Sequence, residues 1–245
     1  MKRWENRVAI VTGASDGTIG GAIALDLVRN GMITIGVARN ISLVELNAKT
    51  GKLIPYKCDL TKPDEIEKMF IWVKANYGGV DVMINNAGVA VMKPILEMEV
   101  EEMKNLLDLN VIALTLFCKL AINSMLERVS TMGTVLGHQV YGYLNFYAAT
   151  KFAVTAVSEG LRKELAQKGS FIKITQISPG RVETKFLYTS FGEKEAYKAK
   201  ALYDSVKSMS PQDVSDAVIH ALSAAPHVQV QDIIFSPMEP TPLAK

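Results

Sequence analysis

The chain has 245 residues, of which 49% are hydrophobic and 21% are charged, and its formal net charge is +2 with a pI near 8.4. This length and composition fit one large α/β domain with a sizeable core. The mild positive charge is scattered, whereas nucleic-acid-binding proteins gather basic residues in a patch or stripe. A polyanion-binding function is therefore not indicated.

The cysteines and the hydropathy of the sequence bear on the cellular compartment and on membrane insertion. Cys58 and Cys118 lie far apart inside apolar runs, which is typical of core residues rather than of a disulfide or a zinc site. We expect a reducing compartment and no metal. A secretory signal is not supported. The longest apolar run, 111–126, is interrupted by Lys119 and is shorter than the roughly 20 residues of a spanning helix, so we expect a core or interface helix and no membrane span.

A glycine-rich segment, 12–21, follows a short β-branched run at 7–11. Strand, glycine loop and helix is the order that a phosphate cradle requires, because glycines allow close approach of the backbone and a helix N-terminus offers free N–H groups. A turn-rich loop without a ligand is the alternative. The helix is expected to end at Gly31. Its apolar face consists of Ile23, Ala24, Leu27 and Val28.

The end of the second expected strand, 32–38, bears on the cofactor. Dinucleotide folds that prefer NAD place an acid there, whereas an arginine accommodates the additional phosphate of NADP. This chain has Ala38-Arg39 and no acid, which favours NADP. Arg39 as a solvated loop cation is the alternative, and Asp16 in the glycine loop would work against a phosphate nearby.

The remaining pattern alternates strands and helices. Further strands are expected at 52–58, 80–84, 129–136, 171–177 and 231–235. One intervening helix is expected to begin with the Thr61 hydroxyl as its cap, and the last with Ser210 as cap and Pro211 in the first position. The segment 185–208 is polar and weakly periodic, which favours a substrate lid. We predict an α/β fold over 1–245, a single doubly wound Rossmann-type parallel sheet flanked by helices.

The most reactive arrangement is Tyr147-Ala148-Ala149-Thr150-Lys151, in a segment with helical periodicity. Residues four apart share a helix face, so a phenol and an ammonium group would lie close together. A cation beside a phenolate lowers the pKa of a tyrosine from its free value of about 10. Tyr147 is therefore a candidate general acid/base, with an ordinary amphipathic helix as the alternative.

Five segments together resemble the short-chain dehydrogenase/reductase family in their order and approximate spacing, over nearly the whole chain. They are Thr12-Gly13…Gly17…Gly20, Asn85-Asn86-Ala87-Gly88, Asn110, Tyr147…Lys151 and Pro179-Gly180…Val182…Thr184. Within this family the chain resembles the farnesol dehydrogenase-like branch. The residues that carry this narrower resemblance are Trp4, Ala38-Arg39, Cys58-Asp59-Leu60, Gly137-His138 and His227-Val228-Gln229-Val230. This resemblance implies a cytosolic NADP-dependent enzyme that acts on apolar alcohols, isoprenoids or ketosteroids.

The resemblance also implies roles for individual residues. Tyr147 would exchange a proton with the substrate oxygen while the nicotinamide carries the hydride, Lys151 would assist it and bind the nicotinamide ribose, and Asn110 would hold a relay water. A hydroxyl, here Thr134, would polarise the carbonyl. The residues implied in NADPH binding are Gly13, Ser15, Asp16, Ile19, Gly20, Arg39, Asp59, Leu60, Asn86, Ala87, Gly88, Tyr147, Lys151, Pro179, Gly180, Val182 and Thr184.

The sequence departs from the family pattern at five places. Thr134 replaces the usual serine, with Ser130 and Thr131 as less favoured substitutes, and Arg181 replaces a small or apolar residue. The glycine loop has one additional residue between Gly17 and Gly20. The connection between the helix of Asn110 and the strand of Thr134 is several residues short, and so is the segment 40–51. These departures support a second hypothesis, a catalytically impaired relative that acts as a cofactor-binding or interaction module.

Two further expectations concern partners. The helix at 111–126 and the helix of Tyr147 resemble those that form four-helix interfaces between family subunits, so a homodimer or homotetramer is expected. His138 would lie close enough to the active strand to touch substrate, although a satisfied loop histidine is the alternative. His220 and His227 are remote from any cluster of carboxylates or cysteines, which predicts no metal site.

Overall fold

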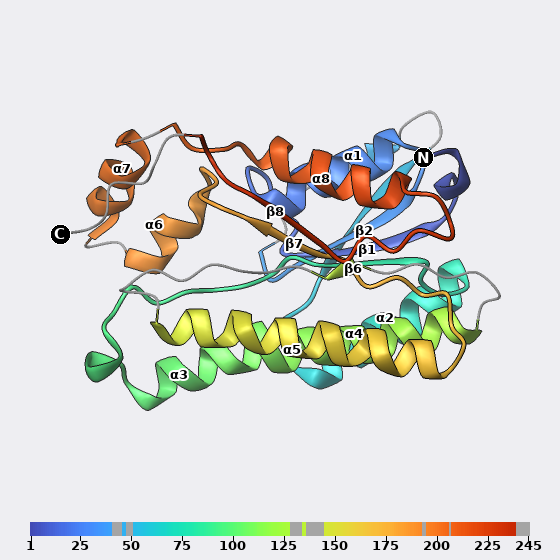
Figure 1. The fold of residues 1–245 in the computed structure, drawn as a ribbon, viewed down its shortest axis with the longest axis horizontal. Coiled ribbons are helices and arrows are strands. Elements are labelled where there is room, and N and C mark those ends of the chain that lie inside the picture. The colour runs from blue at the N-terminus through green and yellow to red at the C-terminus, as the bar shows by residue number, and fades with distance from the viewer. Residues whose placement is uncertain are drawn as a thin grey trace.

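The computed structural model describes residues 1–40, 46–47, 51–127, 134–135, 145–192, 195–205 and 207–238. A central sheet lies between two layers of helices (Figure 1). The described strands are β1 (Val8–Thr12), β2 (Ile33–Ala38), β3 (Leu46–Asn47), β4 (Lys52–Lys57), β5 (Val82–Asn85), β6 (Thr134–Val135), β7 (Gln176–Pro179) and β8 (Asp232–Phe235).

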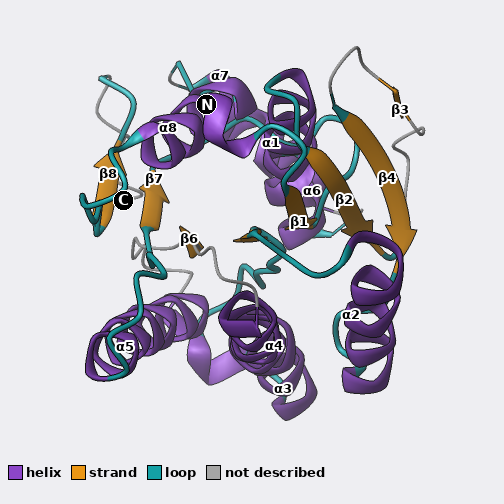
Figure 2. Cartoon of the chain, turned by 90° about the vertical axis from the view of Figure 1, so that its right-hand side faces the viewer, coloured by secondary structure: helices purple, strands orange, loops and turns teal. Residues whose placement is uncertain are grey.

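The sheet has the topology of a doubly wound fold. Six strands are hydrogen-bonded in the order β3-β4-β2-β1-β5-β6, and all pairs are parallel except β3 with β4. The parallel pair β7-β8 continues the layer beyond β6 (Figure 2). The predicted fold class is confirmed. Because parallel strands end at one edge of the sheet, the loops after β1, β2, β4, β5 and β7 gather there.

The helices cover both faces of the sheet. They are α1 (Ile19–Arg29), α2 (Pro63–Tyr77), α3 (Val100–Leu107), α4 (Leu114–Glu127), α5 (Asn145–Gln167), α6 (Lys185–Phe191), α7 (Ala196–Asp204) and α8 (Pro211–Ser223), with short 3₁₀ turns at Lys2–Trp4 and Ile95–Glu97. Helices α1 and α8 lie on one face, and α2, α4 and α5 lie on the other (Figure 1).

The buried apolar residues form two cores, one on each face of the sheet, and strand β1 contributes to both. Val8 and Ile10 pack into the core under α2 and α4, whereas Ala9 and Val11 pack into the core under α1 and α8. Alternate side chains of a strand point to opposite faces, so a strand covered on both sides reads as a continuous apolar run. The four residues predicted for the apolar face of α1 are all fully buried.

Some predicted boundaries differ from the observed ones. Helix α2 has Lys62 as its N-cap, because the Thr61 hydroxyl donates instead to the carboxylate of Asp59 at 2.8 Å. Strand β7 begins at Gln176 rather than at Phe171, whose side chain is 84% exposed. The backbone of Ile174 is hydrogen-bonded to side chains instead of to a neighbouring strand.

One helical run is longer than its apolar stretch suggested. Helices α3 and α4 are joined through a π-helical turn, η3 (Asp108–Ala113), into one run from Val100 to Glu127. This run of 28 residues is long and apolar enough to cross a membrane by length and composition. That criterion is weak, since core helices also meet it, and here Leu106, Phe117 and Met125 are buried in the domain.

Candidate active site

The glycine loop is shaped by close contacts that exclude side chains. Gly13 follows β1 with φ +66°, a conformation that favours glycine. A Cβ atom on Gly20 would lie 2.5 Å from Nδ2 of Asn86 and 2.6 Å from the carbonyl oxygen of Gly13. The loop therefore lies directly on the chain that leaves β5, and packing requires glycine at Gly13 and Gly20.

Asn86 is used inside the protein. Its Nδ2 donates to the carbonyl oxygen of Thr12 at 2.9 Å, and the backbone N–H groups of Asn86 and Ala87 both donate to the Thr12 hydroxyl at 3.1 Å. These bonds hold the loops after β1 and β5 together. The sequence assigned Asn86 to the cofactor, and the structure places its amide beneath the glycine loop.

The first turn of α1 offers backbone donors to an anion. Ile19 and Gly20 donate no backbone hydrogen bond to the part of the chain that the structure describes. Free N–H groups and the positive end of a helix dipole favour a phosphate. The glycine cradle and these two donors therefore fit the pyrophosphate of a dinucleotide.

Arg39 lies at the rim of the candidate site, where the sequence places the adenosine end of a dinucleotide. Arg39 is exposed directly after β2, and the Ser15 hydroxyl donates to the carbonyl oxygen of Asn40 at 3.1 Å. Hydrogen bonds from the Thr61 hydroxyl and N–H lower the pKa of Asp59, and the nearby charge of Arg39 adds to this effect. Arg39 thus lies close to the loops that carry Ser15 and Asp59.

Tyr147 and Lys151 share one face of α5, as predicted. The Lys151 Nζ lies 5.4 Å from the centroid of the Tyr147 ring, and both residues are half-buried. The Phe186 ring on α6 lies 5.9 Å from the same ring. The phenol therefore lies between a cation on its own helix and an aromatic side chain of the segment predicted to be a lid.

Asn110 is brought to this site by the π-helical turn. It is 1% exposed, its Oδ1 accepts from the N–H of Val89, and its Nδ2 donates to the Val89 carbonyl oxygen and to the Thr150 hydroxyl. A Cβ atom on Gly88 would lie 3.3 Å from Oδ1 of Asn110 and 3.6 Å from Nζ of Lys151. Both side chains therefore border the same glycine.

Strand β6 carries Thr134 beside the carboxyl end of β5. Thr134 pairs with Ile84 and Val135 with Asn85, so the strand lies beside the one that leads to Asn86. The alternative residues Ser130 and Thr131, and His138, lie outside the described residues.

The chain after β7 is linked to α7. The N–H of Thr184 donates to the Tyr203 hydroxyl at 3.2 Å, and this hydroxyl is 3.0 Å from the Thr184 carbonyl oxygen, to which it donates. Nη1 of Arg181 donates to the carbonyl oxygen of Leu202 at 2.7 Å. Two side chains therefore join α7 to the segment whose Pro179, Gly180, Val182 and Thr184 the family resemblance assigns to cofactor binding.

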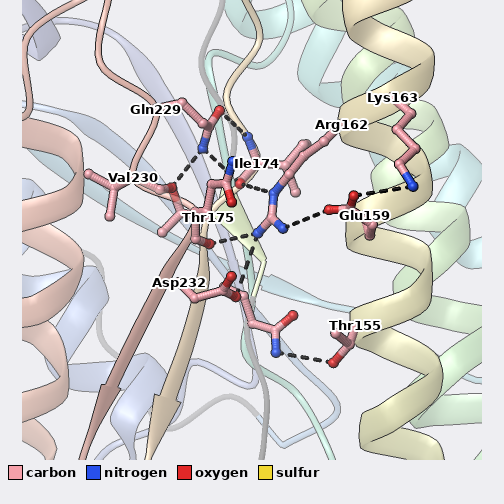
Figure 3. Close-up of polar contacts among 11 residues, drawn as sticks. Thr155, Glu159, Arg162, Lys163, Ile174, Thr175, Gln229, Val230 and Asp232 are labelled. Carbon is pink, nitrogen blue, oxygen red and sulfur yellow. Dashed lines mark hydrogen bonds and ion pairs between the residues drawn. The ribbon is translucent and has the colours of Figure 1, made fainter.

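Helix α5 is anchored at its other half by Arg162 (Figure 3). Its guanidinium donates to the carbonyl oxygens of Ile174 at 2.9 Å and Gln231 at 2.6 Å, and pairs with Asp232 at 3.6 Å and Glu159 at 3.4 Å. These contacts join α5 to the chain that enters β7 and β8. The helix that carries Tyr147 is thereby fixed to the sheet.

Four residues near the site were not singled out by the sequence: Thr18, Thr150, Phe186 and Tyr203. Thr18 is the N-cap of α1, and a threonine at the start of a helix is a signal that could have identified it. The other three act through partners distant in the sequence, for which no local pattern exists.

The chain is also similar to known proteins, both in sequence and in fold. The short chain dehydrogenase profile matches residues 7–195. Dehydrogenase/reductase SDR family member 11 of Gallus gallus is 42% identical, over 98% of this chain and 99% of that protein, and Farnesol dehydrogenase of Aedes aegypti is 38% identical, over 97% and 98%. A serine dehydrogenase solved in its closed form with NADP+ superposes with a TM-score of 0.82 at 26% identity, covering 93% of this chain and 94% of that one.

Proposed function

This chain belongs to the short chain dehydrogenase family, and we propose that it is an NADP-dependent alcohol dehydrogenase or carbonyl reductase for an apolar substrate. The observation that carries the proposal is the placement of the Lys151 ammonium beside the Tyr147 ring, at the sheet edge where the glycine cradle also lies. The proton donor Tyr147 and the dinucleotide bound at the glycine cradle would then both reach the same substrate.

The residues divide the proposed chemistry between them. The nicotinamide, when bound, supplies or accepts the hydride. The Tyr147 hydroxyl donates its proton to the carbonyl oxygen in reduction and takes it back in oxidation, and Lys151 stabilises the phenolate that results. Thr134 is proposed to donate a hydrogen bond to the same oxygen.

Asn110 has a positioning role in this proposal. Its amide holds the backbone of Val89 beside Gly88, and its Oδ1 lies next to the same glycine as Nζ of Lys151. A water that bridges this oxygen and the ammonium would connect Lys151 to solvent, which is the proton relay that the family resemblance implies.

The preference for NADP rests on Arg39. It is exposed after β2, no acid stands at the end of that strand, and its charge acts on Asp59 across the adenosine side of the site. A guanidinium there would pair with a ribose phosphate. The closed serine dehydrogenase with NADP+ supports this choice.

The apolar substrate is supported by an aromatic side chain beside the phenol and by an aromatic pair between α6 and α7. Phe186 contacts the Tyr147 ring, and Tyr188 packs on Tyr203 with ring centroids 5.8 Å apart. We propose that 185–208, which carries α6 and α7, is the substrate lid. The resemblance to Farnesol dehydrogenase supports an isoprenoid or steroid-like alcohol or carbonyl.

The proposal includes a homodimer or homotetramer in the cytoplasm. Ile112 on the long helix is 57% exposed and Phe152 on α5 is 56% exposed, and burying such side chains would favour association. Cys58 and Cys118 are free thiols, which agrees with a reducing compartment. Light scattering tests the oligomer, and a monomer at micromolar concentration would contradict it.

The function is tested with fluorescence titrations of NADPH and NADH, followed by turnover of isoprenoid and steroid carbonyls. We expect NADPH to bind at least about tenfold more tightly than NADH, and Arg39→Ala to remove most of this ratio. Tyr147→Phe should bind NADPH like the wild type and lose turnover. Retained turnover would refute the mechanism, and failure to bind either cofactor would favour an interaction module.

A further inference from the structure

The glycine loop contains an additional residue whose side chain lies inside the loop. Thr18 and Ile19 separate Gly17 from Gly20, where the family pattern has one residue fewer. In the structure Thr18 is the N-cap of α1, with φ −111° and ψ 164°. Insertion of a residue into such a loop would be expected to displace its backbone donors.

The Thr18 hydroxyl instead connects both ends of the loop. It accepts from the N–H of Ser15 at 3.2 Å and from the N–H of Gly21 at 3.0 Å. Its own proton is directed to the carbonyl oxygens of Ser15 at 2.7 Å and Gly13 at 3.1 Å. Four backbone groups of the loop therefore depend on one side-chain oxygen.

This arrangement decides which backbone donors remain for an anion. The N–H groups of Ser15 and Gly21 are occupied by Thr18, whereas Ile19 and Gly20 between them donate to no described residue. The loop is also closely packed, since a Cβ atom on Gly21 would lie 2.2 Å from the carbonyl oxygen of Ser15. Small movements of the backbone are therefore restricted.

We infer that Thr18 is a positioning residue for the cofactor's pyrophosphate: its hydroxyl closes the lengthened loop and directs the Ile19 and Gly20 N–H groups toward the anion. This inference rests on the proposed cofactor binding. The side chain of the additional residue thus keeps the lengthened loop in a shape that can bind the pyrophosphate. The departure from the family spacing is therefore no sign of a lost cofactor site.

The test compares Thr18→Val, which keeps the shape and removes the hydroxyl, with Thr18→Ser, which keeps the hydroxyl. Dissociation constants for NADPH and NADH are measured by fluorescence titration. We expect Thr18→Val to weaken both cofactors by about tenfold, because both carry the same pyrophosphate, and to leave their ratio unchanged. Thr18→Ser should stay within about twofold of the wild type.

Two controls separate this role from neighbouring ones. Ser210→Ala removes the N-cap of α8, and should lower the thermal midpoint as a lost cap does while leaving both dissociation constants unchanged. Arg39→Ala should weaken NADPH alone, so the ratio of the two constants distinguishes the 2′-phosphate from the pyrophosphate.

Three results would overturn the inference. Thr18→Val could bind both cofactors as tightly as the wild type, Thr18→Ser could lose as much affinity as Thr18→Val, or Ser210→Ala could cause the same loss. A wild-type protein that binds neither cofactor would refute the proposed function itself and, with it, this role of Thr18. A failure of the inference alone leaves wild-type NADPH binding intact, so the two failures are distinguishable.

Discussion

The side-chain amide of Asn110 donates a hydrogen bond to the hydroxyl of Thr150 at 3.1 Å, and this hydroxyl donates to the backbone carbonyl oxygen of Tyr147 at 2.7 Å. Both side chains are 1% exposed. The contact joins the π-helical turn of the long helix to α5 at the residue proposed to move the proton. Thr150 is therefore well placed to hold Tyr147 in register.

Replacing this hydroxyl should impair catalysis more than folding. In Thr150→Val one proton of the Asn110 amide loses its partner inside the protein, and α5 can shift near Tyr147. A displacement of about 1 Å can lower a rate about a hundredfold, so we expect kcat to fall between about tenfold and a hundredfold. Thr150→Ser should restore most of kcat, and a valine variant with more than about half of the wild-type kcat would contradict this role.

The α6–α7 segment should become more mobile when Tyr203 loses its hydroxyl. In Tyr203→Phe the N–H of Thr184 loses its acceptor, whereas the hydrogen bond from Arg181 to Leu202 on α7 remains. We expect trypsin to cleave at Lys198 or Lys200 about tenfold faster, because local opening is limited by such contacts. The matched control is Tyr197→Phe on the same helix, whose side chain is 68% exposed. Equal cleavage rates in the two variants would show that the Tyr203 hydroxyl does not hold α7 to the chain after β7.

Arg162 should contribute to global stability. Its side chain is 13% exposed and donates to two backbone carbonyl oxygens that enter β7 and β8. Arg162→Met should lower the free energy of unfolding by about 1.5–3 kcal/mol, since hydrogen bonds from charged groups are lost. The neighbouring Lys163→Met removes only an exposed ion pair with Glu159 and should change it by less than about 0.5 kcal/mol. Urea unfolding measures both, and equal effects would refute the anchor.

Asp26 should make part of the stability dependent on pH. Burial opposes its charge, but hydrogen bonds from Ser215, Gln212 and Arg29 outweigh burial and hold the pKa of Asp26 below the ordinary value of 3.8. A lowered pKa stabilises the folded state above pH 3.8, and this contribution is lost as the pH falls through the folded pKa. These bonds join α1 to α8.

Urea unfolding of wild type and Asp26→Asn therefore should differ most near pH 7 and converge below pH 3.8. The control is Glu67→Gln, an exposed site on α2. A constant difference between the wild type and the Asp26 variant from pH 7 to pH 3 would show that the charge of Asp26 is not the source of its effect.

Both cysteines should be unreactive in the native protein. Burial raises the pKa of Cys118 to about 12, and burial together with the charges of Glu65 and Asp59 raises the pKa of Cys58 to about 11. The reactive species is the thiolate, so at pH 8 we expect almost no reaction with Ellman's reagent until the chain is unfolded, when two thiols should react. Rapid reaction of the native protein would contradict this burial.

Local patterns in the sequence determined the order of the elements and much of the candidate site. The β-branched run of β1, the glycine loop and α1 follow from residues that are neighbours in the chain. The positions of Tyr147 and Lys151 on one face follow from the period of the helix, and the Ser210 cap of α8 follows from a short motif. Each of these depends on interactions within a few residues, which the sequence displays directly.

Competing partners explain where local patterns failed. The Thr61 hydroxyl bonds to Asp59 instead of capping α2, because a carboxylate two residues earlier is within reach. The chain at Ile174 has an apolar composition typical of a strand, but Arg162 and Gln229 satisfy its backbone from other elements. Whether a group bonds locally or to a distant residue is decided by the packing of the whole chain.

Only the tertiary structure decided how the site is held together. Asn86 bonds to Thr12 across 74 positions of the sequence, and Asn110 bonds to Thr150 across 40. Such pairs have no period or motif, because their distance depends on how the sheet brings separate loops to one edge. The sequence by itself therefore determined which chemical groups the chain carries, and the parallel sheet with its crossing helices decided which of them meet.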